Sequence, residues 1–168
     1  MKFSELKGRA VVSLEDASKI GEVQDLMIEP GTRRIISLKV KTGMFSSARL
    51  VPATDVKNVG ADAVTISAHA VSAAGQEGNG NGSNGSTEGT QALVKLTGIL
   101  GNKVVTDAGT FVGELHDILL EWVDLTITGY EVRESGMFAK TQEFAATPDV
   151  SYGDKMITIP AVLLNQPK

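Results

Sequence analysis

The alternation of apolar and polar positions contains one nine-residue pattern twice, at residues 21–29 and at residues 113–121. Four of the nine positions are identical in the two copies. Each copy ends in a dense apolar run, Leu26–Ile28 or Ile118–Leu120, which is too short for a helical stripe and long enough for a strand buried on both faces. The pattern therefore predicts the central strand of a small all-β unit, present twice in the chain.

Both copies break the two-residue alternation of a strand at the same point. Val23 and Leu26 are three positions apart, as are Leu115 and Ile118, so strict alternation would place the members of each pair on opposite faces. One extra residue restores the phase. We therefore expect a β-bulge at Asp25 and another at Asp117. A carboxylate at a bulge usually accepts backbone N–H groups that the interrupted ladder leaves without a partner.

Short runs rich in β-branched residues surround each copy, separated by turns that contain Gly, Pro or Asp. Five or six short strands at about ten-residue spacing favour a sandwich or barrel over a parallel sheet with helices. The runs lie at residues 10–13, 35–40, 50–52 and 63–66 in the first part and at residues 104–106, 125–133 and 156–159 in the second.

A stretch rich in Gly, Asn and Ser separates the two parts. Residues 73–90 contain no large apolar side chain, so nothing in this stretch can offset the entropy of ordering it. We expect a flexible tether whose ends lie about 20–25 Å apart. The predicted organisation is all-β: two tandem small, partly open β-barrels at residues 1–72 and 91–168, joined by a flexible linker at residues 73–90.

Composition restricts the class of protein. The 168 residues include no cysteine, so neither disulfides nor thiolate metal sites can support the fold. The first residues lack the apolar run of a signal peptide, and no window approaches the roughly 18 apolar residues of a membrane span. We therefore expect a cytoplasmic protein without a membrane span.

Charge is distributed unequally between the two parts. Residues 1–72 contain ten Lys and Arg against eight Asp and Glu, whereas residues 89–168 contain six against ten. The split favours self-association or a protein partner over a polyanion. A nucleic-acid-binding domain is usually clearly basic, so nucleic acid is the less favoured partner.

The order of these features resembles the PRC-barrel domain. The second copy departs from it most where Ala146-Thr147-Pro148 replaces Val51-Pro52. The features that carry the resemblance are Leu6-x-Gly8, Gly21-Glu22-Val23-x-Asp25-Leu26, Gly43-Met44-Phe45 and Val51-Pro52-x-x-Asp55-Val56, with Leu96-x-Gly98, Gly113-Glu114-Leu115-x-Asp117-Ile118 and Gly136-Met137-Phe138 in the second copy.

The resemblance implies a small, partly open β-barrel that binds other proteins and has no catalysis of its own. Such domains occur in the reaction centre H subunit and at the C-terminus of a ribosome maturation factor. The chain lacks the membrane helix of the former and the preceding domain of the latter, so neither specific role transfers. Many stand-alone members have no assigned role.

The paired carboxylates of the duplicated strand are the first candidates for chemistry. Glu114, His116 and Asp117 could form an acid/base pair or a metal site, but one His beside two acids is too few ligands for zinc or iron. The first copy has Gln24 where the second has His116. No Gly-x-Ser-x-Gly motif is present. We expect structural carboxylates, no catalytic residue, no cofactor and no metal.

Three other features are candidate interfaces. Arg33 and Arg34 begin the one basic concentration, which is a solvated face or an RNA-binding surface. Met44-Phe45 and Met137-Phe138 follow glycines and could plug the open end of each barrel, which we favour, or contact a partner. Trp122 lies where a turn is expected and could anchor a partner or cover the core of its own unit.

These observations predict a non-enzymatic interaction or scaffold protein that binds an unidentified protein and self-associates. A barrel of about 80 residues is marginally stable alone, so packing one unit on the other would add stability. We expect the basic first unit to meet the acidic second one. The alternative is an RNA- or ribosome-associated factor that binds through the basic face of the first unit.

Overall fold

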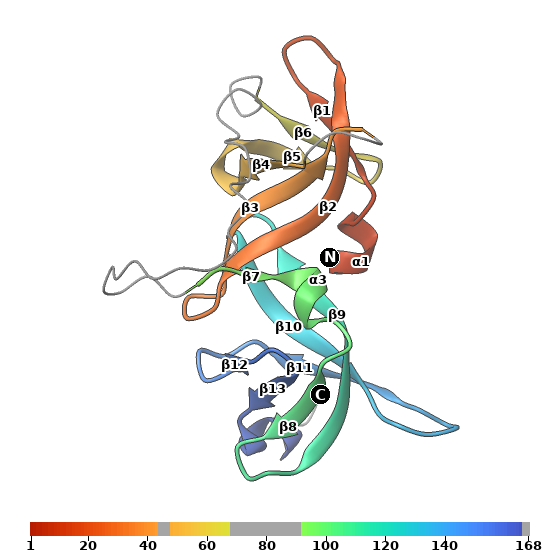
Figure 1. Cartoon of the computed structure of the whole chain (residues 1–168), viewed down its shortest axis with the longest axis vertical. Coiled ribbons are helices and arrows are strands. Elements are labelled where there is room, and N and C mark those ends of the chain that lie inside the picture. Colours follow the sequence, from red (N-terminus) through yellow and green to blue (C-terminus); the bar gives the residue numbers. More distant parts are fainter. Residues whose placement is uncertain (44–47, 68–91, 166–168) are drawn as a thin grey trace.

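The structure is a computed structural model, which describes residues 1–43, 48–67 and 92–165. We call residues 1–67 the first half and residues 92–165 the second half. The predicted linker and both predicted domain boundaries fall within residues 68–91, outside the described residues, and stay predictions. Strands predominate in both halves, as expected for an all-β chain (Figure 1).

The first half begins with a one-turn helix and continues as six strands, of which β2 and β3 are the longest. Antiparallel ladders join β1 to β2, β2 to β3 and β3 to β4, while β6 returns to pair in parallel with β1. The elements are α1 (Phe3–Leu6), β1 (Ala10–Ser13), β2 (Lys19–Glu29), β3 (Arg34–Lys41), β4 (Arg49–Pro52), the 3₁₀ turn η1 (Ala53–Asp55), β5 (Val56–Val59) and β6 (Ala63–Ile66).

The second half repeats this connectivity. β8, β9, β10 and β11 form antiparallel ladders in sequence, and β13 returns to pair in parallel with β8. The elements are β7 (Val94–Lys95), α3 (Leu96–Ile99), β8 (Lys103–Thr106), β9 (Phe111–Glu121), β10 (Thr126–Arg133), β11 (Thr141–Ala145), β12 (Ser151–Tyr152), β13 (Met156–Ile159) and the 3₁₀ turn η2 (Ala161–Asn165).

The duplicated strands carry the expected irregularity. In the ladder of β2 with β3, Val23 pairs with Val40 and Asp25 with Lys39, so one extra residue of β2 lies between them. The ladder of β9 with β10 shifts register at the corresponding point, beside Asp117. Val23 and Leu26 are both buried as a result, as are Leu115 and Ile118 in the second half.

A glycine after each one-turn helix returns the chain to the sheet. Gly8 and Gly101 have φ angles of +84° and +81°, in the left-handed region that glycine adopts without steric cost. This match corrects one expectation from the sequence. The counterpart of Leu6-x-Gly8 is Ile99-x-Gly101, and the predicted counterpart Leu96-x-Gly98 was wrong by three residues, because it falls inside α3.

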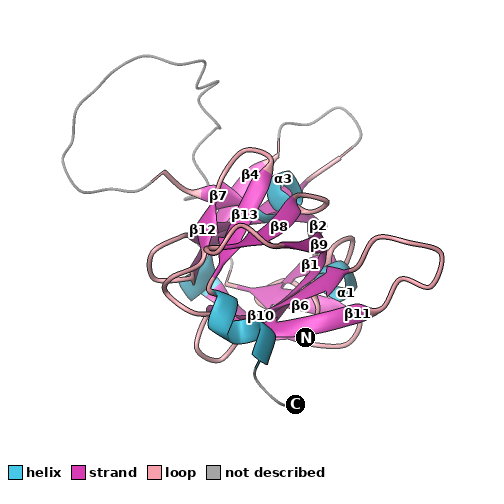
Figure 2. Cartoon of the chain, turned by 90° about the horizontal axis from the view of Figure 1, so that it is seen from below, coloured by secondary structure: helices cyan, strands magenta, loops and turns pink. Residues whose placement is uncertain are grey.

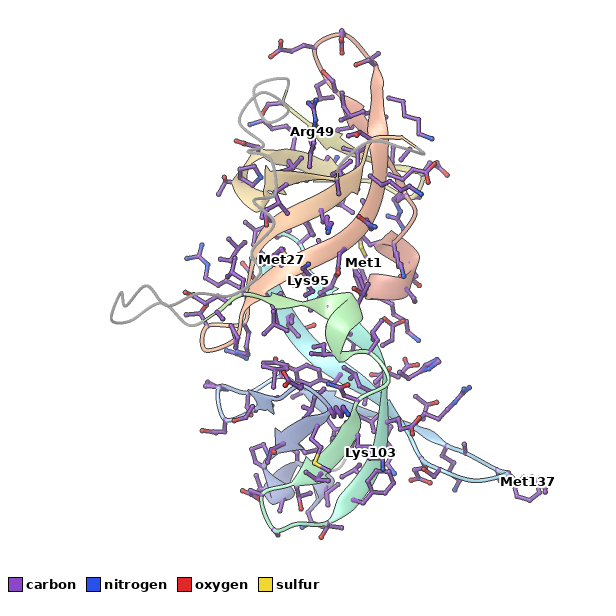
Figure 3. The ribbon with its side chains drawn as sticks, viewed as in Figure 1. Met1, Met27, Arg49, Lys95, Lys103 and Met137 are labelled. Carbon is purple, nitrogen blue, oxygen red and sulfur yellow. The ribbon has the colours of Figure 1, made fainter. Side chains whose placement is uncertain are left out.

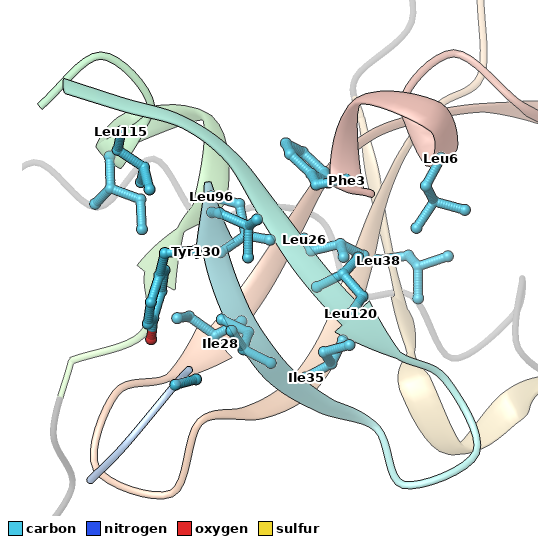
Figure 4. Close-up of a cluster of buried hydrophobic side chains, with 14 of the residues drawn as sticks. Phe3, Leu6, Leu26, Ile28, Ile35, Leu38, Leu96, Leu115, Leu120 and Tyr130 are labelled. Atoms are coloured by element: carbon cyan, nitrogen blue, oxygen red, sulfur yellow. The ribbon is translucent and has the colours of Figure 1, made fainter. Parts of the chain in front are cut away.

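The two halves form one continuous body. All described strands belong to a single sheet of thirteen strands, which passes from one half to the other where Arg34 pairs with Thr126. Buried apolar side chains from both halves belong to one cluster (Figure 4). Viewed from below, strands make up most of this body, and α1 and α3 lie apart at its periphery (Figure 2). The sheet does not close on itself.

Candidate interaction surfaces

Each half is covered by the N-terminal segment of the other. We call residues 1–6 the first arm and residues 94–99 the second arm. In the first arm, α1 lies on β9, and the amide N–H of Leu120 donates to the Met1 carbonyl at 2.8 Å. In the second arm, α3 lies on β2, and Val94 pairs with Ile28. The arms are therefore exchanged between the halves.

Apolar side chains anchor both arms. Phe3 and Leu6 of the first arm are fully buried, as is Leu96 of the second, and Ile99 is 4% exposed. Phe3 and Leu96 belong to the same buried cluster as Leu115, Leu120 and Tyr130 (Figure 4). Burying a side chain of this size stabilises a fold by about 1.5–3 kcal/mol. The two arms are therefore integral parts of the core.

The two bulge carboxylates hold the arms. Asp25 accepts the Thr97 amide N–H at 3.1 Å and the Thr97 hydroxyl, while Asp117 accepts the Ser4 amide N–H at 3.1 Å and the Ser4 hydroxyl. Ser4 and Thr97 are the second residues of one-turn helices, so their N–H groups have no partner inside the helix. Each buried carboxylate thus completes the helix start of the opposite half.

The same carboxylates also act within their own strands. The amide N–H of Leu26 donates to Asp25 and that of Ile118 to Asp117, both at 2.8 Å. The sequence predicts carboxylates that serve the interrupted ladder, and the contacts agree. It does not reveal Ser4 and Thr97 as their partners. The available signal was a hydroxyl residue directly after the first residue of each one-turn helix, Phe3 or Leu96.

The first arm has an additional ion pair. The Lys2 ammonium lies 2.5 Å from a carboxylate oxygen of Glu131, a buried residue of β10. Its hydrogen bond with Glu131 raises the pKa of Lys2. The position of Glu131 in the first half is held by Lys39, which pairs with Asp25 as Glu131 pairs with Asp117. The two arm sites therefore differ in charge.

His116 does not form a metal site or an acid/base pair with the neighbouring acidic residues. Its Nε2 atom lies 3.9 Å from Glu131, and its side chain is 46% exposed. The Asp117 carboxylate beside it is directed to Ser4 and Ile118. Within the described part of the chain, no three His, Asp or Glu side chains are placed to bind a metal ion together.

Arg33 and Arg34 lie at the junction of the halves. The Arg33 guanidinium donates to the Ala146 carbonyl, and its backbone carbonyl accepts the Ile127 amide at 3.0 Å. Arg33 is half-buried, while Arg34 is exposed and pairs with Thr126 of β10. Arg33 therefore contacts the second half of its own chain, and only part of its surface is presented to solvent.

A buried tyrosine, Tyr130, and a half-buried one, Tyr152, lie beside this junction. The hydroxyl groups of Tyr130 and Tyr152 share a hydrogen bond, and the rings pack edge to face with centroids 6.2 Å apart. Burial raises the pKa of both phenols, most strongly that of Tyr130, and the nearby Arg33 charge opposes the rise.

Trp122 lies in the turn between β9 and β10 and packs partly against the core. Together with Val123 and Leu125 it forms one wall of a groove between the halves, about 480 Å³ in volume. The other wall comes from η1 and β5 of the first half, including Val56 and Val59, with Met1 also lining the groove. Trp122 is therefore placed between the two halves.

Met137 and Phe138 are fully presented to solvent. They lie in the loop between β10 and β11 and are 95% and 91% exposed. The expectation that this pair plugs the open end of a barrel was wrong, because the hairpin carries it away from the body (Figure 3). Met44 and Phe45, the corresponding pair of the first half, lie outside the described residues.

A comparison with protein families finds a known domain in the first part of the chain. The family model of the PRC-barrel domain matches residues 1–71. The PRC-barrel domain is in general a protein-interaction module. The PRC-barrel match ends before the second half, whose likeness to the first rests on its strand pairing. A search of curated proteins found no match to the chain. No helix among the described residues is long and apolar enough to cross a membrane.

Proposed function

We propose that the chain is a non-enzymatic interaction or scaffold protein, in which two PRC-barrel-like modules form one body and present their outer surfaces to protein partners, including further copies of the chain. The reciprocal exchange of the arms is the observation that carries this proposal. A chain whose halves complete each other presents two related surfaces in a fixed arrangement.

The second half is the second module of this proposal. It repeats the antiparallel β1–β2–β3 ladder as β8–β9–β10 and the parallel β1–β6 pair as β8–β13. The bulge carboxylate and the arm that it holds also recur. Such agreement in connectivity, bulge position and helix capping supports a common origin of the halves, with divergence beyond the reach of the family match.

The arrangement of the buried carboxylates supports a structural rather than a chemical role for the duplicated strand. Asp25 and Asp117 are 3% and 4% exposed, and each accepts bonds from the opposite arm. A general base must reach a proton of a bound substrate. Carboxylates enclosed in this way are directed to the protein itself.

RNA binding through the basic face of the first half is the alternative. The half-buried position of Arg33 and its bond to Ala146 do not favour it. Binding of labelled RNA to the full chain and to an Arg34→Ala variant at increasing salt would test it. Binding that weakens steeply with salt and with the substitution would favour RNA over protein partners.

Cross-linking in the native cell tests the interaction function. The full chain, tagged at one end, should cross-link to a distinct protein or to another copy, and the partner should bind the purified chain directly. An unrelated tagged protein of similar size and charge provides the control. Cross-links confined to pairs of residues within one chain would contradict the proposal.

A further inference from the structure

The contacts between the halves are made twice, with the roles of the halves exchanged. The amide N–H of Ile35 donates to the Leu125 carbonyl at 2.7 Å. In return, the amide N–H of Ile127 donates to the Arg33 carbonyl at 3.0 Å. Arg33 and Leu125 have φ angles of +60° and +51°, in the left-handed region that residues other than glycine seldom adopt. Each arm likewise binds the bulge carboxylate of the opposite half. Such reciprocity is typical of the two subunits of a symmetric dimer.

Neither half completes its own core. We call the surfaces of β2 and β9 that the arms cover the two seats. The seat on β9 buries Phe3 and Leu6 of the first arm, and the seat on β2 buries Leu96 of the second arm. A unit of this size is marginally stable alone, and an empty seat would expose apolar surface to water. Each half therefore requires a complementary half, and the contacts are the same whether that half belongs to the same chain or to another.

Charge selects the complementary half. The formal charge is +2 over residues 1–72, with ten cations and eight acids, and −4 over residues 89–168, with six cations and ten acids. At the junction, Arg34 of the first half lies opposite Thr126 of the second. Two first halves would place two Arg34 side chains opposite each other, and two second halves would bring together like net charges. Because like charges disfavour the wrong partner, a first half pairs best with a second half.

Residues 68–91 link the halves and lie outside the described residues, whereas every contact named above is made by described residues. The sequence predicts a flexible tether at residues 73–90. A short flexible tether gives the units that it joins an effective concentration in the millimolar range. Pairing within one chain is therefore favoured in dilute protein, and pairing between chains competes with it as the protein concentration approaches this range.

We propose that two copies of the chain exchange halves, so that each body of the dimer combines the first half of one copy with the second half of the other. This proposal rests on the self-association included in the proposed function, and it names the contact between the halves as the surface that joins the copies. Exchange of identical elements reproduces every contact of the single chain and needs no new interface. The outer surfaces of both bodies stay free, so self-association and partner binding do not compete, and the dimer presents each outer surface twice.

Disulfide formation between single-cysteine variants tests the exchange, because the parent chain contains no cysteine. Lys95 of the second arm lies opposite Met27 of β2 in an antiparallel ladder, at a separation that suits a disulfide (Figure 3). The Lys95→Cys chain and the Met27→Cys chain are mixed in urea, refolded together at concentrations up to about 1 mM and oxidised. Mass spectrometry should identify a link between residue 27 of one copy and residue 95 of another, and the share of linked dimer should rise with the protein concentration during refolding.

Two controls accompany this experiment. The double variant Met27→Cys with Lys95→Cys should form its disulfide within one chain in dilute protein, which shows that the pair can be linked. A mixture of a Ser151→Cys chain with a Thr158→Cys chain should form no link between these two positions of different copies, because the two residues pair inside the second half.

The outcomes separate the exchange from self-association in general. If the double variant links within one chain but residues 27 and 95 of different copies never link, the exchange is overturned. Gel filtration of the parent chain then decides the rest: a dimer leaves self-association through another surface, whereas a monomer at every concentration overturns self-association as well. A double variant that forms no link within one chain would also overturn the exchange, because the second arm would then not lie on β2.

Discussion

The bonds between the arms and the bulge carboxylates have a measurable energy. Replacing Thr97 by Ala removes the hydroxyl that donates to Asp25 and leaves the amide bond in place. A hydrogen bond to a charged group contributes about 1.5–3 kcal/mol. Because Thr97 is half-exposed, we expect the low end of this range, a loss of about 1.5 kcal/mol in the free energy of unfolding.

Replacing Asp25 by Ala should lower the free energy of unfolding more than replacing Thr97 does. Both bonds from Thr97 are lost, and the buried amide N–H of Leu26 also loses its acceptor. With about 1.5 kcal/mol for each of the two bonds from Thr97 and about 1–3 kcal/mol for the unpaired Leu26 donor, the total loss should be about 4–6 kcal/mol. With the carboxylate absent, the additional change Thr97→Ala should have almost no effect. The coupling energy of the two residues should therefore be about 1.5 kcal/mol.

Urea unfolding followed by circular dichroism measures these three variants and the parent chain, provided that the m-values agree. The second arm site provides a repeat and a control. Ser4→Ala should couple to Asp117→Ala by a similar amount, whereas Ser4→Ala and Asp25→Ala share no bond and should add within about 0.5 kcal/mol. A coupling near zero for both native pairs, or equal coupling in the crossed pair, would refute the reasoning.

Two further predictions concern the core. A Cβ atom at Gly113 would overlap the Arg133 carbonyl oxygen, so Gly113→Ala should destabilise the fold by about 3 kcal/mol. The control Gly98→Ala should be close to neutral, because the nearest atom to a Cβ there is 3.8 Å away. A comparison of the urea midpoints of the two variants checks this prediction, and equal midpoints would contradict it. Tyr130 and Tyr152 are the two tyrosines of the chain, and burial raises the pKa of both above the unfolded value near 10. Their stabilising effect is complete below pH 10 and declines as pH rises above it, because the unfolded chain then releases protons that the folded chain retains. Phenolate absorbance should therefore appear only together with the loss of circular dichroism in an alkaline titration, and absorbance that rises near pH 10 in the folded chain would contradict the burial of the pair.

The apolar pattern predicts the sheet well because each strand is defined locally. The three-residue spacing of Val23 and Leu26 is enough to place the bulge, and the duplication of that spacing is enough to infer a second unit. The destination of the arms is not a local property. Phe3 and Leu6 are recognisable as anchors, but nothing in their neighbourhood indicates whether they pack on their own half or on the other.

For the candidate surfaces, too, the sequence predicts local features but not contacts between distant residues. Asp25 is predictable as a bulge residue, yet its partner Thr97 lies 72 positions away and is brought to it by the exchange of arms. The exposure of Met137 and Phe138 could not be inferred either, since a Gly-Met-Phe segment is equally compatible with a barrel plug and with a free tip. The length of the β10–β11 hairpin decides between them.

The exchange of arms, on which this account depends, can be tested by cutting the chain between its halves. A protease site introduced into residues 73–90 of the full chain would allow complete cleavage under native conditions, followed by native mass spectrometry and gel filtration. If each half holds the arm of the other, the two fragments stay together as a 1:1 complex and separate only in denaturant. Two folded fragments that separate in buffer without denaturant would contradict the account.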